Sequence, residues 1–433
     1  MRGGSYARLA AHVVRVSAAQ LATRNAAPSS PESTVALPVV TQARRLAVFG
    51  LLLVAEFFYS WAWNTVDVLR PYLRQSLGLS LFQAGSAYSA QGAGALIGAV
   101  VVGQLADRIG RSQMLVVVML GYGAALIAGV AVNSYATLLA QRVLLGLFLG
   151  GVFPVVVGIY VDLFEPGVRG RLASLLMAVF SSAIVALGIA ASHVSFADWH
   201  LLLWLGGLPP VALAFAVHWI VPKAATVPRE RSGKGLPIVE LFAPGVRRTT
   251  LLLTALVGCN FFAYQAFSGW LTLYLGEIRH LPTATVGAVV AVQFSGNIVG
   301  AFFWGWIGDR FGRKANAVGF FGCSAATALF LAPTGSLVSL QVLGFFYGAT
   351  LAASVIWGPW LAELYPLSLR STAVSIFNWG RIVSFFAPLL TARLAGTVGL
   401  RWAMMVASLM FAVAAAIWLM IPETLRSTRE VST

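Results

Sequence analysis

The chain has 433 residues, of which 59% are hydrophobic and only 10% are charged, and its formal net charge is +15. A soluble protein of this size carries about 25% charged residues. This composition excludes an ordinary soluble enzyme, a nucleic-acid-binding domain and a disordered scaffold. At roughly 30 residues for each span and its loop, the chain is long enough to cross a bilayer about a dozen times.

Residues 1–45 form the first distinct segment. They are rich in Arg, Ala and Ser, contain a single acid at Glu32, and include no apolar run long enough for a signal peptide. We expect a disordered N-terminal extension, with an organellar targeting segment or a wrongly assigned start codon as alternatives. Arginine outnumbers lysine 26 to 3, which is typical of GC-rich coding and favours a bacterial inner membrane over an organellar membrane.

Twelve apolar runs follow, each near the length needed to cross the hydrocarbon layer. Because an open strand would leave backbone groups unsatisfied in lipid, these runs must be α-helices. The sequence therefore predicts an all-α membrane protein with twelve transmembrane helices. The runs cover residues 46–70, 85–106, 113–133, 136–160, 172–194, 200–221, 249–276, 284–308, 315–333, 336–361, 372–396 and 400–421.

The segments between these runs divide the basic residues unevenly. If the N-terminus lies in the cytoplasm, the cytoplasmic segments hold 22 Lys and Arg residues and the outer segments hold 5. Basic residues favour the cytoplasmic side, so this distribution predicts an even number of helices with both termini cytoplasmic. The basic loop 222–248 is then a cytoplasmic linker, and residues 422–433 are a cytoplasmic tail.

One loop sequence occurs twice. The segment from Gly103 to Arg111, GQLADRIGR, returns 202 residues later from Gly305 to Arg313 as GWIGDRFGR. A second pair, Asp162 and Glu363, repeats at an offset of 201 residues. Two repeats at almost the same offset indicate a duplicated chain with two six-helix halves.

The paired loops resemble the signature of the major facilitator superfamily, and the resemblance covers about residues 46–421. It implies two six-helix bundles, residues 46–221 and 249–421, that rock about a central substrate site. It also implies that the loop acid caps a helix end and pairs with nearby arginines, which locks one conformation. The alternative is that these charges only fix the topology. The predicted latch residues are Gly103, Asp107, Arg108, Gly110, Arg111, Asp309, Arg310, Gly312 and Arg313.

Two acids lie within the first apolar run. Glu56 is near the middle of the bilayer and Asp67 is near its outer end, and an eleven-residue spacing places them on one helix face with Tyr59 and Trp63. An ionisable group inside a span is costly unless it is paired or hydrated, so it is a candidate for function. We predict that Glu56 or Asp67 carries a coupled proton. Alternatively, Asp67 is an interfacial residue that reaches water.

Arg142 opens the pattern R-x-x-x-G-x-x-x-G in the fourth run, where the glycines are Gly146 and Gly150. The glycines allow close helix approach, and the depth of Arg142 matches that of Asp67, which makes an ion pair between them geometrically possible. The pattern also resembles a motif of the same superfamily whose arginine is linked to proton transfer. We therefore assign Arg142 to proton coupling, with a purely structural role as the alternative.

Arg381 lies about nine residues into the eleventh run, without an acid in the same run to balance it. The guanidinium fork matches a carboxylate, so we predict that Arg381 binds a substrate anion. The alternative is an ion pair with Glu56 across the two halves. Polar side chains at a similar depth complete the predicted substrate site, although single amides are also typical of helix packing; they are Tyr59, Asn260, Tyr264, Gln265, Gln293, Asn297 and Asn378.

The sequence therefore predicts a secondary transporter that carries a small organic anion together with protons, by alternating access. It contains no nucleotide-binding loop of the form G-x-x-x-x-G-K-[ST], so the expected energy source is a proton gradient, with no cofactor and no metal. The overall pattern resembles that of the sialate, monocarboxylate and aromatic-acid proton symporters. The expected partners are a small-molecule substrate and the lipid bilayer, without nucleic acid, and the expected state is a monomer.

Other functions remain as alternatives. A sugar or polyol transporter is one, because Pro422-Glu423-Thr424 is similar to a sugar-porter loop. A non-transporting membrane sensor is another, although no stretch supplies the large soluble domain that it needs. A membrane-embedded enzyme would need clustered metal ligands or a nucleophile with its base, and the sequence offers neither.

Overall fold

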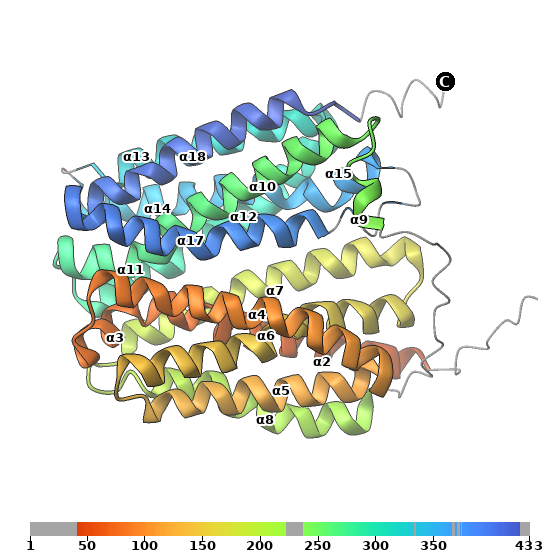
Figure 1. Ribbon diagram of the computed structural model, residues 1–433, viewed down its shortest axis with the longest axis horizontal. Coiled ribbons are helices and arrows are strands. Elements are labelled where there is room, and N and C mark those ends of the chain that lie inside the picture. The colour runs from red at the N-terminus through yellow and green to blue at the C-terminus, as the bar shows by residue number, and fades with distance from the viewer. Residues whose placement is uncertain are drawn as a thin grey trace, which may run out of the picture. The chain divides into compact units, whose positions relative to one another are not determined.

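The computed structural model is helical throughout the residues that it describes, and Figure 1 shows the helices running side by side. Helices satisfy their own backbone hydrogen bonds, which a chain this apolar requires in lipid. The predicted all-helical architecture is confirmed. The described residues are 41–221, 237–332, 335–365, 369, 373 and 375–424.

The first half of the chain forms long helices joined by short turns. Several begin at a serine cap: the Ser80 hydroxyl accepts a hydrogen bond from the Gln83 backbone N–H, and Ser134 does the same for Thr137. Such caps satisfy backbone donors that the first turn leaves free. The helices are α2 (Gln42–Val68), α3 (Arg70–Leu77), α4 (Leu81–Ile109), α5 (Arg111–Ala128), α6 (Tyr135–Leu163), α7 (Pro166–His193) and α8 (Leu201–Ile220).

The second half repeats this arrangement, with 3₁₀ turns that interrupt the helical path at Ser268–Trp270 and at Ala352–Ile356. After α10 the chain makes a 3₁₀ turn at Ser268–Trp270, the short α11, and a π-helical turn at Tyr274–Ile278. The helices are α9 (Pro237–Glu240), α10 (Arg247–Phe267), α11 (Leu271–Leu273), α12 (Thr283–Phe311), α13 (Ala317–Phe330), α14 (Leu337–Leu351), α15 (Trp357–Leu364), α17 (Ser375–Val398) and α18 (Leu400–Met420).

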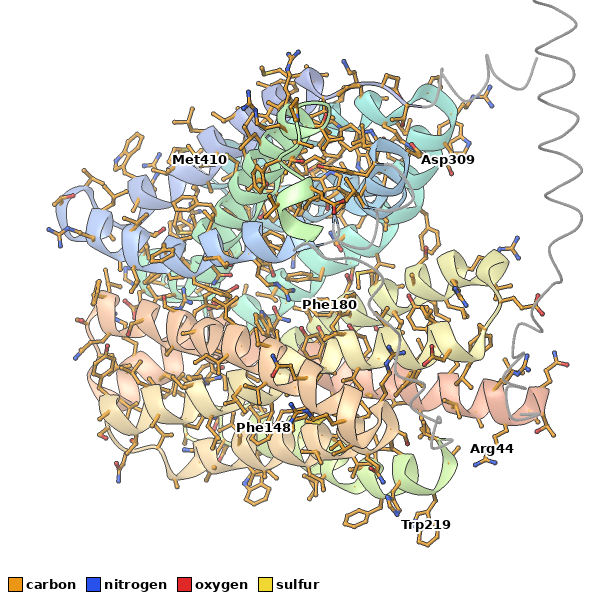
Figure 2. All side chains as sticks on the ribbon, turned by 45° about the vertical axis from the view of Figure 1, so that its right-hand side comes forward. Arg44, Phe148, Phe180, Trp219, Asp309 and Met410 are labelled. Carbon is orange, nitrogen blue, oxygen red and sulfur yellow. The ribbon has the colours of Figure 1, made fainter. Side chains whose placement is uncertain are left out.

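Eleven helical segments in the described residues are long and apolar enough to cross a membrane. They correspond to eleven of the twelve predicted runs. The remaining run, 315–333, contains α13, which has 14 residues and follows a 3₁₀ turn at Arg313–Asn316. The sequence pattern overestimated this helix because the apolar run extends beyond the regular α-helix. Side chains such as Trp219, which is 79% exposed and points away from the helices in Figure 2, are suited to contact lipid.

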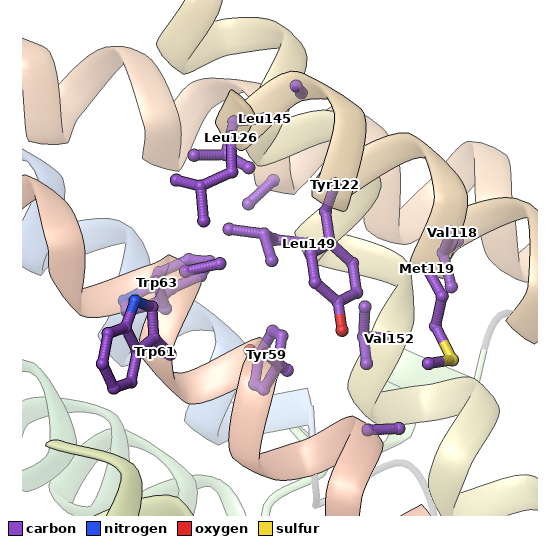
Figure 3. Close-up of a cluster of buried hydrophobic side chains, with 14 of the residues drawn as sticks. Tyr59, Trp61, Trp63, Val118, Met119, Tyr122, Leu126, Leu145, Leu149 and Val152 are labelled. Carbon is purple, nitrogen blue, oxygen red and sulfur yellow. The ribbon is translucent and has the colours of Figure 1, made fainter. Parts of the chain in front are cut away.

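The buried apolar side chains fall into three clusters. One cluster uses residues between Val48 and Val221 together with a single residue of the second half, Phe385. Figure 3 shows part of it, where residues of α2, α5 and α6 pack together. The other two clusters use the second half, apart from Ile184. Both sets of helices belong to one unit that begins at Arg45.

Glycines hold paired helices within each half at very short range. A Cβ atom on Gly94 of α4 would lie 2.1 Å from a backbone carbonyl oxygen of α6, and one on Gly146 of α6 would lie 2.0 Å from a carbonyl oxygen of α4. Gly296 of α12 and Gly348 of α14 repeat this arrangement, at 2.1 and 1.8 Å. A side chain larger than hydrogen does not fit at these positions.

The two halves meet along α4 with α17 and along α7 with α12. Phe180 of α7 lies between them in Figure 2 and packs against core residues of both halves. We call the two ends of the helices the α3 end, which also carries α11, and the α15 end, which also carries α9 (Figure 1).

Candidate functional site

Glu56 is a buried acid without a hydrogen-bond partner in the described helices. Its side chain on α2 is fully buried, and neither carboxylate oxygen has a hydrogen-bond partner among the described residues. Its surroundings are phenolic: Tyr122 of α5 and Tyr160 of α6 interact with it electrostatically. The Tyr122 hydroxyl is also buried without a partner, and its ring points toward Tyr59 in Figure 3.

Arg381 of α17 reaches the first half across aromatic rings. Its guanidinium carbon lies 5.0 Å from the ring centre of Trp63 on α2 and 5.9 Å from that of Phe261 on α10, within the range of a cation–π contact. It also interacts electrostatically with Tyr59 and with Glu56. Because both Glu56 oxygens lack a hydrogen-bond partner, the alternative of a direct Glu56–Arg381 pair is not what this conformation contains.

Asp67, at the other end of α2, has many partners. Its Oδ1 atom accepts hydrogen bonds from Arg70 at 2.6 Å and from Gln265 of α10 at 2.9 Å. Its backbone carbonyl accepts a third from the Thr272 hydroxyl of α11 at 2.7 Å. Asp67 is only 8% exposed, so the alternative of an interfacial residue reaching water does not describe it. Two of its three partners come from the second half.

Arg70 is the residue that joins these groups. It is 1% exposed, its other terminal nitrogen donates to the Gly269 carbonyl, and its guanidinium carbon lies 4.4 Å from the Trp270 ring centre. The Gly269 carbonyl belongs to the 3₁₀ turn that interrupts the helix. An ion pair between Arg74 and Glu277 adds a second link at the α3 end. Arg70 is not among the site residues predicted from the sequence, although its three-residue spacing from Asp67 is typical of a helical ion pair.

Arg142 does not pair with Asp67, although their similar depth made such a pair geometrically possible. It is 2% exposed and donates to the Thr65 hydroxyl at 3.2 Å and to the Gln91 side-chain oxygen at 3.3 Å. Arg70 lies one turn from Asp67 and takes the carboxylate. Arg142 influences Asp67 only through its charge.

A small cavity of about 20 Å³ lies between the halves beside Asp67. Gln293 of α12 donates to the Ser268 hydroxyl at 2.9 Å, and Ser268 donates to the Tyr347 hydroxyl at 3.1 Å. The lining combines polar groups with apolar side chains, and it includes neither Glu56 nor Arg381. The lining residues are Asn64, Asp67, Val68, Ile184, Tyr264, Ser268, Leu271, Thr272, Val290, Gln293 and Phe294.

The remaining amides of the predicted substrate site have different surroundings. Asn297 accepts a hydrogen bond from Ser181 across the halves at 3.0 Å and donates to the Gly348 carbonyl at 3.2 Å, which is typical of helix packing. Asn260 is buried and its side-chain oxygen has no partner among the described residues. The side chain of Asn378 lies outside the described part of the chain.

The first signature loop forms a partly exposed ion pair at the α15 end. Arg111 donates to Asp162 at 2.7 Å and to the Gly158 carbonyl at 3.1 Å. Gly110 takes a positive φ of 97°, which favours glycine at this sharp turn. Arg108 is exposed, a Cβ at Gly103 would meet open space, and the side chain of Asp107 lies outside the described residues.

The second signature loop is bonded more extensively. Arg313 donates to Asp309 at 2.7 Å and to Glu363 at 2.6 Å, while its backbone N–H donates to Glu423 at 2.9 Å. The hydrogen bond to Glu363 raises the pKa of Arg313 above its ordinary value, so the arginine stays charged. Gly312 has a φ of +106°.

Arg310 is exposed and lies outside this network, with its guanidinium carbon 5.7 Å from the Trp306 ring centre. Sequence reasoning missed Glu423 as a partner of the loop. The motif Pro422-Glu423-Thr424 was the signal for it.

Comparison with known families gives one match that covers most of the chain. The family model described as Major Facilitator Superfamily matches residues 52–292 and 253–432. The two ranges overlap at residues 253–292.

Several characterised proteins are similar over most of their length. The 3-(3-hydroxy-phenyl)propionate transporter of Escherichia coli (strain K12) is 26% identical over 374 residues, which are 84% of this chain and 91% of that protein. The 4-hydroxybenzoate transporter PcaK of Pseudomonas aeruginosa is 27% identical over 374 residues, covering 77% and 82%. The niacin transporter NiaP of Acinetobacter baylyi is 25% identical over 344 residues, covering 70% and 76%.

Solved structures with the same fold include a D-xylose–proton symporter, with a TM-score of 0.72 at 15% sequence identity, covering 88% of this chain and 98% of the other. A bacterial homologue of the human lysosomal transporter Spinster, in an inward-facing and unoccupied conformation, gives 0.71 at 16% identity with the same coverage. At this level of identity the likeness concerns the fold alone.

Proposed function

Because the chain belongs to the major facilitator superfamily, we propose that it is a proton-coupled symporter of small organic anions, and specifically of aromatic carboxylates. It is a multi-pass membrane transporter of small molecules and not an enzyme. The single observation that carries the proposal is the position of Arg381, which presents a charge among aromatic rings at the boundary between the halves.

Arg381 and the rings around it can bind both parts of an aromatic acid, the carboxylate and the ring. A guanidinium group can bind a carboxylate through two parallel hydrogen bonds, and no such bond to an acid occupies it within the described residues. Trp63, Phe261 and Tyr59 surround it with rings from both halves. Offset or edge-on ring contacts stabilise an aromatic substrate there. The named relatives that carry aromatic acids support this substrate class.

Glu56 is the group best placed to carry the coupled proton. A buried carboxylate without a hydrogen-bond partner is costly when ionised, so the surroundings of Glu56 favour the protonated carboxyl in this conformation. Its electrostatic interaction with Arg381 links the two events, because an anion bound at Arg381 removes the positive charge that favours ionised Glu56. The proton and the anion therefore occupy the transporter together.

The energy source that we propose is the proton gradient across a bacterial inner membrane, acting on a monomer. All the named relatives above are bacterial proteins. The chain carries no nucleotide-binding loop, so a gradient is the drive that its sequence allows.

A sugar substrate is the second candidate, since the fold of the D-xylose–proton symporter matches. In this chain the sugar-porter-like Glu423 bonds to the signature loop at the α15 end, far along the helices from Arg381. A neutral sugar also offers no carboxylate to the charge of Arg381, so the aromatic acid is the better candidate.

Uptake into proteoliposomes tests the proposal. Purified protein is reconstituted, an inward proton gradient is imposed, and accumulation of radiolabelled 4-hydroxybenzoate and xylose is followed with and without a protonophore. We expect accumulation of the acid that collapses with the protonophore, and no accumulation of xylose. Uptake of xylose, or acid uptake indifferent to the gradient, would contradict the proposal.

A further inference from the structure

The small cavity beside Asp67 is separate from the charge of Arg381 and has its own chemistry. Asn64 and Asp67 of the first half line it, together with Tyr264, Ser268 and Gln293 of the second half. A volume of about 20 Å³ accommodates one water molecule or one hydroxyl group. The apolar remainder of the lining, which includes Phe294 and Leu271, suits the edge of a ring.

The hydrogen-bond acceptors of this cavity are not used up within the protein. Gln293 is only 1% exposed, and its buried side-chain oxygen has no hydrogen-bond partner among the described residues. Both hydrogen bonds to the Asp67 carboxylate go to Oδ1, and Oδ2 accepts none of those that the structure records. A buried acceptor left without a donor is costly, so the Gln293 oxygen calls for a donor from a ligand, and Asp67 Oδ2 is a second acceptor beside it.

The side-chain nitrogens of Asn64 and Gln293 already donate hydrogen bonds within the protein. The Asn64 side-chain nitrogen donates to the Ser60 carbonyl at 2.8 Å, and the Gln293 nitrogen donates to Ser268. The orientation of the Asn64 amide is fixed, because the Ser60 carbonyl can only accept. The orientation of the Gln293 amide is the one that agrees with the Ser268 hydroxyl donating to Tyr347. What faces the cavity is therefore a set of oxygen acceptors together with the Tyr264 hydroxyl.

We propose that this acceptor cavity binds a hydroxyl group of the transported acid, at the end of the substrate opposite the carboxylate. It selects hydroxylated aromatic carboxylates over the same acids without the hydroxyl. The inference rests on the proposed function. Arg381 attracts the carboxylate, whereas the Asp67 carboxylate at the cavity is paired with Arg70 and offers no free positive charge to it. Tyr264 lines the cavity and interacts electrostatically with both Asp67 and Arg381.

A small cation is the other ligand that an acceptor-rich site could take. The Arg70 guanidinium, 2.6 Å from the Asp67 carboxylate, already neutralises that acid and would repel a second cation. A neutral donor fits this charge arrangement better, and sodium becomes an outcome of the test.

Pairs of acids that differ by one hydroxyl provide the test. Dissociation constants are measured on the purified full-length protein for 4-hydroxybenzoate against benzoate, and for 3-(3-hydroxyphenyl)propionate against 3-phenylpropionate. Each pair is measured in sodium and in potassium buffer. A hydrogen bond to a charged or buried acceptor gives about a 10- to 100-fold preference for the hydroxylated member in at least one pair, with no effect of sodium.

Two substitutions test whether the cavity causes the preference for hydroxylated acids. Gln293→Met removes the unpartnered oxygen, and Tyr264→Phe removes only a hydroxyl; both should reduce the ratio of the two dissociation constants within each pair of acids, whatever their effect on the overall affinity. Gln141→Met is the matched control. Gln141 is also a buried glutamine whose oxygen lacks a partner, but it lies on α6 outside the cavity and donates to the Ala125 carbonyl.

The outcomes distinguish failure of the hydroxyl site from failure of the proposed transport function. Equal affinities within both pairs, or a preference that survives in both variants, would overturn the hydroxyl site and leave aromatic acid transport standing. Sodium-dependent tightening of benzoate binding would assign the cavity to a cation instead. If the wild-type protein binds none of the four acids, the proposed function fails and the hydroxyl site fails with it. Because each preference is a ratio within one variant, partial loss of folded protein does not mimic the expected result.

Discussion

Glu56 and Asp67 lie eleven residues apart on α2, and both are buried, yet their surroundings are opposite. Glu56 has no hydrogen-bond partner among the described residues. Asp67 binds Arg70 and Gln265 through its carboxylate and Thr272 through its backbone. An acid without partners can gain and lose a proton with little structural change, whereas an acid with partners holds two parts of the chain together. From this comparison we propose that Glu56 couples the proton and that Asp67 holds the α3 end closed.

The largest effect is expected from removing the titratable group itself. Glu56→Gln keeps the shape but carries no exchangeable charge, so gradient-driven accumulation of 4-hydroxybenzoate should be abolished while exchange of internal for external substrate continues. Both are measured in proteoliposomes. Glu165→Gln, the same change at an exposed helix start, should leave accumulation intact. Accumulation by the Glu56 variant at the wild-type level would refute the assignment.

Removing the partner of Asp67 should act on conformation instead. Arg70→Met leaves a buried carboxylate unpaired, at a cost of about 3–5 kcal/mol to the closed α3 end. Spin labels at Gln75 and Ile278, in a background without Cys259 and Cys323, should then report a longer distance. Arg111→Met, which breaks a partly exposed pair within the first half, is the control and should leave this distance unchanged. An unchanged distance in the Arg70 variant would mean that other contacts close this end.

A smaller effect on transport is expected from replacing Arg381. Arg381→Lys keeps the positive charge but loses the planar fork, so the KM for aromatic acid uptake should rise about 10- to 100-fold. Arg401→Lys is the matched control, because Arg401 also lies over an aromatic ring, 5.1 Å from the centre of Trp402. Equal KM values in the two variants would remove Arg381 from the substrate site.

The smallest effect is expected from a single neutral hydrogen bond to Asp67. Thr272→Val removes the bond to the Asp67 carbonyl and should shift the closing equilibrium by about 0.5–1.5 kcal/mol, well below the effect of Arg70→Met. The spin-label distance distribution measures both. Thr327→Val is the control, since the hydroxyl of this buried threonine donates within its own helix to Cys323. A Thr272 effect as large as that of Arg70 would show that the carboxylate pair is not the main closing contact.

The sequence predicted those features that depend on composition and on single positions. The helices follow from apolar runs, and Glu56 and Arg381 are conspicuous because they are ionisable groups within such runs. The partners of Asp67 could not be predicted, because Gln265, Thr272 and the Gly269 carbonyl reach it through an interruption of α10 that leaves no clear mark in the hydrophobic pattern. The apparent match in depth between Asp67 and Arg142 was misleading, since depth along a helix does not specify which neighbour is nearer.

The close glycine contacts between α4 and α6 and between α12 and α14 have a mechanical consequence. With a carbonyl oxygen about 2 Å from where a methyl group would begin, the paired helices interlock and cannot slide past one another without separating. We therefore expect each pair to move as one unit. The boundary between the halves contains a similar contact, where a Cβ on Gly287 of α12 would lie 2.4 Å from the Gly188 carbonyl oxygen of α7, but hydrogen bonds that can exchange partners, such as that from Ser181 to Asn297, also join it.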